Sequence, residues 1–380
     1  MSRFFRSRSF AVGVLAVAVP AAVAVATAVP GASAMTFGAE NEFHQTNLIS
    51  DRSDQGAQVV DPNLLNAWGL ALSPTSPLWV ADNNAGVATV YSINVGGTMA
   101  KKVNLTVTLP GGRASTGDGS SPTGQVFNPT SGFVVTSNAG SGPGLFIFSA
   151  EAGQISAWNP AADPVVNGAS TAQVEFSSPT AVYKGLTIAS NGRGTFLFAS
   201  NFHDGRVDVF NSKFHRVRMP GNFRDPFLPR GYAPFGIQAI GGFIYVSYAL
   251  QNAAKHDDVA GPGHGFIDIY TTDGFLVKRL VSRGDLNSPW GLAVAPQGFG
   301  PFGGDLLVGN FGDGLIHAYG LFSGRPHGAL LDEQRQPIQI DDLWALQFGT
   351  AATGGTGTLL FSAGINDEKD GLVGSINPVP

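Results

Sequence analysis

Aromatic residues recur along the chain at one kind of position, where they could bind a small molecule. Trp68, Trp290 and Trp344 each stand directly before a Gly-Leu-Ala or Ala-Leu-Gln segment, and they are three of the chain's five tryptophans. The residues at this position are Trp68, Ser131, Lys184, Phe235, Trp290 and Trp344. An indole face stacks on sugar rings and other flat apolar groups, and it attracts cations. The pattern favours a ligand site; the alternative is that the rings only fill the centre of the fold.

Short polar residues form a second recurring set, each placed just after an apolar segment. The members that we consider for ligand binding are Asn83, Asn201, Asn310 and Asp313. A few polar groups beside an apolar surface are typical of small-molecule sites. Asn and Asp are also frequent turn formers, so the alternative for this set is a purely structural role.

Catalytic candidates are few. His203 and Asp204 are adjacent and could act as an acid–base pair, and Lys184 stands among the aromatic positions. The chain has no cysteine, which excludes disulfides, thiol nucleophiles and Cys-ligated zinc. It also lacks a Gly-x-Ser-x-Gly elbow, a His-Glu-x-x-His motif and a phosphate loop. Whether the protein is an enzyme stays open, with His203, Asp204 and Lys184 as the first suspects.

Two segments contain possible metal ligands. Residues 249–264 include His256 and His264 with two aspartates, and could bind a transition metal; the alternative is a flexible polar loop. Residues 366–371 imitate the first half of a calcium loop, but Asn377 stands where that loop needs a bidentate Glu. We therefore predict no metal and no other cofactor.

A repeat of β-strands must position these residues. The clearest strand reads Gly, any residue, a small aliphatic, a polar residue, a small residue and an aromatic. It occurs, the last time weakly, at Gly86–Tyr91, Gly153–Trp158, Gly205–Phe210, Gly265–Tyr270, Gly314–Tyr319 and Gly371–Ile376. An apolar strand precedes each, at Leu78–Ala81, Leu145–Phe148, Phe196–Ala199, Phe243–Val246, Leu306–Gly309 and Leu359–Ser362. The aromatic positions begin a third strand upstream, and the stretches between units supply a fourth. This predicts an all-β, six-bladed propeller with four-stranded blades.

The chain ends explain how the ring closes. The last repeat stops at Asn377, too early for its own fourth strand, while His44–Ile49 forms an extra strand before the first blade. If this N-terminal strand completes the sixth blade, no edge remains unpaired. Because adjacent strands are antiparallel, the start of each first strand and the end of each second strand share one face. The aromatic and polar sets should therefore meet there.

The order Trp68-Gly-Leu-Ala, an apolar strand ending in Ala-Asp-Asn83, then Gly86-Val-Ala-Thr-Val-Tyr91 resembles NHL-type and gluconolactonase-like propellers. It is most similar to exported bacterial and fungal six-bladed propellers without an assigned activity, over residues 43–377. Gluconolactonase-like propellers commonly hold a divalent ion with Asn or Asp at the position where this chain has its aromatic set. Such a cation needs several converging oxygens, so the resemblance does not extend to that metal site.

Composition and the N-terminus limit partners and location. The formal charge is −5 with 13% charged residues, which argues against a nucleic-acid partner. Residues 1–34 carry three Arg, an apolar stretch and the ending Ala32-Ser-Ala34, as in a signal peptide; the alternative is a membrane anchor. We predict a propeller over 35–380, secreted or periplasmic, monomeric and without a membrane span.

Our leading functional prediction is a secreted propeller that binds a small or extended ligand, such as a glycan, at a Trp-lined central mouth. The first alternative is a hydrolase or lyase acting on a lactone or a sugar-derived substrate. The second is a cell-surface scaffold for protein partners.

Overall fold

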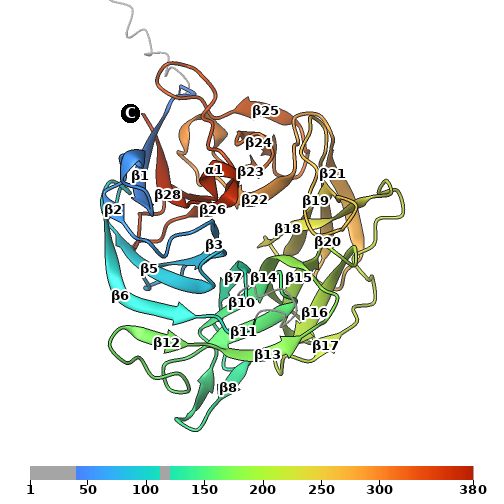
Figure 1. The fold of residues 1–380 in the computed structure, drawn as a ribbon. Coiled ribbons are helices and arrows are strands. Elements are labelled where there is room, and N and C mark those ends of the chain that lie inside the picture. The colour runs from blue at the N-terminus through green and yellow to red at the C-terminus, as the bar shows by residue number, and fades with distance from the viewer. Residues whose placement is uncertain (1–39, 112–119, 380) are drawn as a thin grey trace, which may run out of the picture. The chain divides into compact units, whose positions relative to one another are not determined.

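The computed structural model describes residues 40–111 and 120–379, and in this part six β-sheets stand around one axis (Figure 1). Each sheet contains four antiparallel strands, ordered from the axis outward along the chain, except that the sixth sheet takes its outer strand from the N-terminus. This confirms the predicted all-β, six-bladed propeller with four-stranded blades. The predicted signal peptide, residues 1–34, lies outside the described residues.

The blades follow one another in chain order. Blade 1 contains β3 (Ala67–Ala71), β4 (Leu78–Asp82), β5 (Val87–Ile93) and β6 (Ala100–Thr108). Blade 2 contains β7 (Pro122–Phe127), β10 (Phe146–Ala150), β11 (Gln154–Trp158) and β13 (Gln173–Ser177). Blade 3 contains β14 (Tyr183–Asn191), β15 (Gly194–Asn201), β16 (Arg206–Asn211) and β17 (Arg216–Val217). Blade 4 contains β18 (Tyr232–Ile240), β19 (Phe243–Leu250), β20 (Phe266–Thr271) and β21 (Leu276–Ser282). Blade 5 contains β22 (Pro289–Val294), β23 (Asp305–Asn310), β24 (Ile316–Gly320) and β25 (Pro326–Ala329). Blade 6 contains β26 (Leu343–Phe348), β27 (Leu359–Ala363), β28 (Leu372–Pro378) and β1 (Phe43–Ser50).

Short elements extend this frame. β2 (Val59–Val60) pairs with β1, and β12 (Ala169–Thr171) pairs with β6, both in parallel. β8 (Val134–Thr136) and β9 (Ser141–Pro143) form a separate hairpin. The helical elements are η1 (Ser53–Gln55), η2 (Gly300–Phe302) and α1 (Ile365–Glu368).

The glycine in the inner strands is required by the close approach of neighbouring blades. A Cβ at Gly69 would overlap the backbone carbonyl of Thr123 in the next blade, and one at Gly236 would overlap the carbonyl of Trp290. Hydroxyl groups fasten the same contacts: Ser200 Oγ donates to the Phe235 carbonyl across the blade boundary at 2.6 Å. The repeated Gly thus lets the inner strands approach the axis closely enough to pack.

Strand β1 closes the ring as predicted. It pairs antiparallel with β28, and Gln45 lies opposite Ile376 in this register. The sixth blade thereby gains its fourth strand, and β28 is no longer an edge.

The inner strand of blade 2 differs from the sequence interpretation. Ser131 does not occupy the first position of an inner strand; it is exposed in a bend before β8. The equivalent position belongs to Thr123 in β7, before Gly124, whose Cβ would meet Leu186 of blade 3. We missed β7 because Gln125 replaces the expected aliphatic residue. Its buried amide donates to the carbonyls of Gly69 and Trp79, at 2.6 and 2.7 Å.

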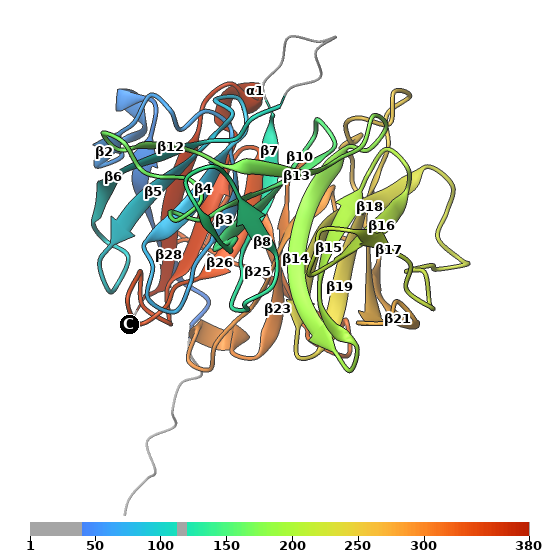
Figure 2. The same ribbon diagram turned by 90° about the horizontal axis from the view of Figure 1, so that it is seen from below.

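The inner strands begin at the end of the blades where α1 lies, which we call the α1 face; the β14–β15 hairpin lies at the opposite end (Figure 2). Among the described residues, no helix is long and apolar enough to cross a bilayer.

Candidate functional site

The predicted aromatic residues converge at the axis and pack on one another. We call Trp68, Phe235, Trp290, Phe311 and Trp344 the aromatic layer. Trp68 and Trp344 stack with ring centroids 3.5 Å apart, and Phe311 stacks on Trp344 at 4.1 Å. Trp290 meets both tryptophans edge-on at 6.4 and 6.0 Å, and Phe235 lies 5.9 Å from Trp344. Trp68 and Trp344 are each 1% exposed, so in this structure their ring faces contact each other rather than solvent.

The space beyond the aromatic layer is small. A cavity of about 40 Å³ is lined by residues of the inner strands, Trp290 among them, and is large enough for a few water molecules. Trp290 is only partly buried, and its indole N–H donates to the Lys184 carbonyl at 2.9 Å. A ligand at the α1 face would therefore meet the polar residues around this layer.

Lys184, predicted as a catalytic suspect, is the centre of that polar group. It begins the inner strand of blade 3, and its side chain is 3% exposed. The ammonium pairs with Glu151 in the β10–β11 turn, lies 3.6 Å from Asp257 Oδ1 and lies 5.1 Å from the Trp68 ring centroid. Burial alone would lower the pKa of Lys184, but the charges of Glu151 and Asp257 raise it above its ordinary value. Lys184 is therefore a charged ammonium at neutral pH rather than a base or a nucleophile.

His256 and Asp257 come from the insertion at residues 249–264. His256 Nδ1 lies 2.6 Å from Asp257 Oδ1, a hydrogen bond that raises the pKa of His256 and lowers that of Asp257 to about 2. Ligand atoms of Glu151, His256 and Asp257 all lie within 4.8 Å of one another. The insertion, whose His and Asp residues the sequence indicated as possible metal ligands, therefore brings charged groups next to Lys184.

Glu368 reaches the same region from an unusual turn. Asn366, Asp367 and Glu368 all have left-handed backbone angles, with φ of 62°, 55° and 59°. Asn66 Nδ2 donates to Glu368 Oε2 at 2.9 Å. The side-chain oxygen of Asn66, Oδ1, accepts a hydrogen bond from the Trp344 indole N–H at 2.9 Å. Burial raises the pKa of Glu368 to about 7, so this carboxyl exchanges a proton near neutral pH. We call Glu151, Lys184, His256, Asp257 and Glu368 the mouth cluster.

The other predicted polar residues have mixed placements. Asn83 contacts the mouth cluster, since its Nδ2 donates to Glu151 Oε2 at 3.1 Å. Asn201 donates to Asp204 and Asp208 at 3.1 and 2.9 Å, which holds the turn after β15. Asn310 Nδ2 donates to the Asp285 carbonyl at 2.7 Å. Asp313 Oδ1 accepts the Leu315 backbone N–H at 3.1 Å. In these hydrogen bonds Asn201 and Asp313 act as turn formers, whereas Asn310 links the end of β23 to the segment before β22.

The suspected acid–base pair does make contact. His203 Nδ1 lies 3.0 Å from Asp204 Oδ1, and Arg206 pairs with Asp204 Oδ2 at 2.7 Å. Partial burial raises the pKa of Asp204, but the His203 hydrogen bond and the Arg206 charge outweigh it and lower the pKa overall. Asp204 is thus a stable carboxylate that can orient His203, and the pair belongs to the β15–β16 turn.

Sequence reasoning missed Glu151 and Glu368. Both stand in the connection between the second and third strands of a blade, at or beside which Asn83, Asn201 and Asn310 stand in other blades, but the predicted polar set contained only Asn and Asp. The available signal for Glu368 was its segment, Gly364-Ile-Asn-Asp-Glu-Lys, which makes this connection longer than the corresponding ones in blades 1, 2, 3 and 5.

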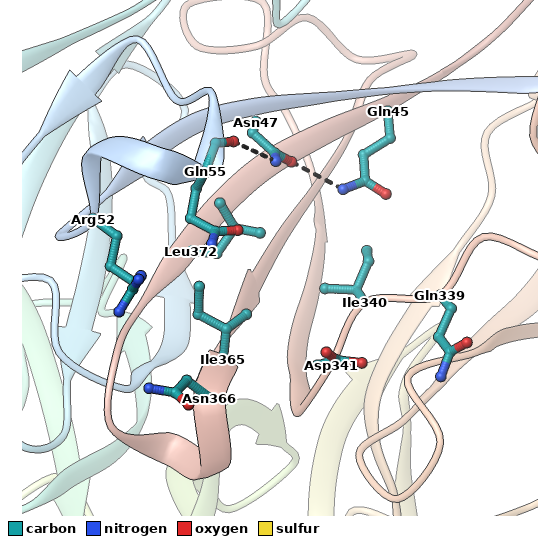
Figure 3. A pocket seen from close by; sticks show the side chains of 10 residues that line it. All are labelled: Gln45, Asn47, Arg52, Gln55, Gln339, Ile340, Asp341, Ile365, Asn366 and Leu372. Atoms are coloured by element: carbon teal, nitrogen blue, oxygen red, sulfur yellow. Dashed lines mark hydrogen bonds between the residues drawn. The ribbon is translucent and has the colours of Figure 1, made fainter.

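A second pocket, of about 460 Å³, lies between β1, β28 and the segment that leads into blade 6 (Figure 3). Its lining residues are Gln45, Asn47, Arg52, Gln55, Gln339, Ile340, Asp341, Ile365, Asn366 and Leu372. Side-chain amides dominate this lining, over a floor of buried Ile340, Ile365 and Leu372. The left-handed turn contributes Asn366 to this pocket and Glu368 to the mouth cluster.

Comparison with known proteins gives relatives without an assigned activity. No protein-family model matches the chain. Uncharacterized protein R648 of Acanthamoeba polyphaga mimivirus is 33% identical over 336 residues, covering 87% of this chain and 78% of R648. Uncharacterized protein L690 of the same virus is 33% identical over 337 residues, covering 87% of this chain and 84% of L690.

Among solved structures, the soluble aldose sugar dehydrogenase of Escherichia coli superposes with a TM-score of 0.50 at 12% identity. The match covers 89% of this chain and all of the dehydrogenase, and it shows a shared fold only. The sequence identity to the two viral proteins is higher, at 33% over 87% of this chain. The chain belongs to the same protein family as mimivirus R648 and L690.

Proposed function

We propose that this protein is a binding propeller that recognises a small molecule with a positively charged group at the mouth cluster. The observation that carries the proposal is the surplus of acidic groups in the mouth cluster: three carboxyls, Glu151, Asp257 and Glu368, act on Lys184 and outnumber the cluster's two cationic groups, Lys184 and His256. A site with excess charge of one sign concentrates ligands of the opposite sign. The predicted signal peptide would place this site outside the cytoplasm.

Exposure indicates which groups meet the ligand. The side chains of His256 and Asp257 are 46% and 60% exposed, whereas those of Lys184 and Glu151 are 3% and 13% exposed. Asp257 is thus the first carboxylate that an approaching cation reaches, with Glu151 beneath it. A protonated amine suits this arrangement, because its hydrogen atoms form charge-assisted hydrogen bonds with carboxylates. The ligand class that follows is an amine, of which an amino sugar is the glycan form.

The test compares glucosamine with glucose and N-acetylglucosamine, which share its ring but lack the charge. We expect calorimetry to detect glucosamine and not the neutral sugars, with affinity falling as ionic strength rises. Asp257→Asn should weaken glucosamine binding at least tenfold. Asp273→Asn, which removes a carboxylate in the β20–β21 turn at the opposite end, should not. Equal binding of glucose, or an Asp257→Asn variant that binds normally, would refute the proposal.

A second candidate function is a hydrolase or lyase that acts on a lactone or sugar-derived substrate. The observation that favours it is Glu368, whose pKa of about 7 suits a general acid–base and whose side chain Asn66 holds in place. Lys184 would stabilise developing negative charge nearby. Turnover of a lactone by the wild type, lost in a folded Glu368→Gln variant, would establish this activity over simple binding.

A further inference from the structure

We infer that the Lys184 ammonium takes the place of a divalent metal ion at the mouth of this propeller. Gluconolactonase-like propellers, which the sequence resembles, hold such an ion through residues at the inner-strand position before the glycine. In the structure, that position is occupied by Trp68, Thr123, Lys184, Phe235, Trp290 and Trp344. The inner strands therefore supply no carboxylate, and the question is what the ring holds instead.

Thr123 is the one possible oxygen ligand in that ring, and its hydroxyl is already used. It donates to the Tyr183 carbonyl at 2.7 Å, which links blade 2 to blade 3, and it lies 3.2 Å from both Ser149 oxygens. Thr123 is also fully buried, in contact with the backbone of the next blade. The inner-strand ring of this chain thus does not fit a hard divalent cation, which needs several converging oxygens.

Acidic and imidazole ligands do converge, but from turns rather than from inner strands. Glu151, His256 and Asp257 place ligand atoms within 4.8 Å of one another. Two carboxylates and one imidazole form a set that Mn²⁺ or Zn²⁺ could bind. The Lys184 ammonium already pairs with Glu151 and lies 3.6 Å from Asp257. A metal ion and an ammonium cannot share these carboxylates, because the two cations would repel at short range beside the buried Lys184–Glu151 pair.

The surroundings hold the ammonium in that place. The Trp68 ring lies on one side, at 5.1 Å from Nζ, and contributes a cation–π contact. Asn83 fixes the second oxygen of Glu151 at 3.1 Å, so the carboxylate keeps facing Lys184. Unlike a bound ion, a lysine ammonium cannot dissociate. The site therefore has a permanent positive charge that chelators cannot remove and that lends no open coordination position to a substrate.

The test is Mn²⁺ titration of the full mature chain, followed by electron paramagnetic resonance. We expect the wild type to bind Mn²⁺ at least tenfold more weakly than Lys184→Met, whose unbranched apolar side chain preserves the packing on Trp68. Adding Asp257→Asn to Lys184→Met should abolish the gain. Lys278→Met, which removes an exposed lysine of β21, should leave Mn²⁺ binding as in the wild type.

If Lys184→Met does not fold, the wild type and the Asp257→Asn variant still test the inference. Tight Mn²⁺ binding by the wild type that Asp257→Asn removes would overturn the inference, because the ammonium would then not exclude the metal. A folded Lys184→Met variant without any gain in Mn²⁺ affinity would overturn it as well. Neither result bears on glucosamine binding, which is measured without metal, so the two proposals fail separately.

Discussion

Replacing Glu368 with Gln should stabilise the folded protein, and the gain should grow with pH. Glutamine has nearly the shape of a protonated glutamic acid, and its carbonyl oxygen can still accept the hydrogen bond from Asn66. What the substitution removes is the buried negative charge. Burial raises the pKa of Glu368, and the charges of Glu151 and Asp342 add to the effect, while Lys184 opposes it.

The magnitude follows from the pKa values in the two states. Ordinary glutamate titrates at 4.5 and Glu368 at about 7. Between about pH 4.5 and about pH 7 this carboxyl ionises in the unfolded chain but stays protonated in the folded protein. Ionisation therefore favours the unfolded chain, and the free energy of unfolding falls as the pH rises through this range. One pH unit corresponds to about 1.4 kcal/mol, so the full effect is on the order of 3 kcal/mol. Above pH 7 it should remain constant.

Urea denaturation at pH 5, 6, 7 and 8 would measure this difference between Glu368→Gln and the wild type. The unfolding free energies should differ by less than about 1 kcal/mol at pH 5 and by about 3 kcal/mol at pH 8, with the variant more stable. Glu333→Gln removes an exposed glutamate that contacts His44 at the opposite end of β1, and it controls for the loss of one charge. A Glu368→Gln variant that is less stable than the wild type at pH 8 would refute the buried-charge reasoning.

Two further predictions concern the aromatic layer and the left-handed turn. Trp68→Ala should cost about 3 to 5 kcal/mol of stability because it empties a buried stack, whereas partly exposed Trp290 should cost less when replaced by Ala. Equal losses in thermal and urea unfolding would show that Trp290 is as much a core residue as Trp68. Asp367→Ala should be about 1 kcal/mol less stable than Asp367→Gly, because φ is 55° and the side chain is 90% exposed. Equal stability of these two variants would mean that the turn relaxes to another conformation.

Much of the fold could be predicted because the same physical constraint recurs around the ring. In five of the six described blades the inner strand approaches its neighbour closely and has a Gly there, as at Gly69 and Gly236, while blade 6 has the small Ala345. The closing strand was predictable for a related reason, since pairing with β1 removes the unpaired edge of β28. The exception is β7, where Gln125 satisfies two backbone carbonyls from inside the core. A buried amide whose N–H groups donate to backbone carbonyls looks, in sequence, like a surface residue.

The candidate site was predictable only in part. Lys184 could be found because it stands in the repeat, at a position that the fold brings to the axis. Glu151, Asp257 and Glu368 come from a turn, an insertion and a left-handed segment, whose lengths differ from blade to blade. The direction of a side chain in an irregular turn depends on local backbone angles, such as φ of 59° at Glu368, which no residue pattern specifies. Side chains of this kind meet through geometry that only the folded chain determines.

The mouth cluster gathers three features that lower stability, and a propeller needs none of them for closure. Three consecutive non-glycine residues have left-handed backbone angles, each of which costs about 1 kcal/mol or more. Glu368 is a carboxyl that burial disfavours as an anion, and Lys184 is an ammonium taken out of water. Replacing buried ion pairs by apolar residues is often neutral or stabilising, so the Lys184–Glu151 pair is poorly explained as a stabilising contact. Apolar burial is supplied by the aromatic layer beside it and by the cores of the blades. Strain and perturbed ionisable groups that coincide at one mouth are the physical grounds for assigning function there rather than to the tryptophans alone.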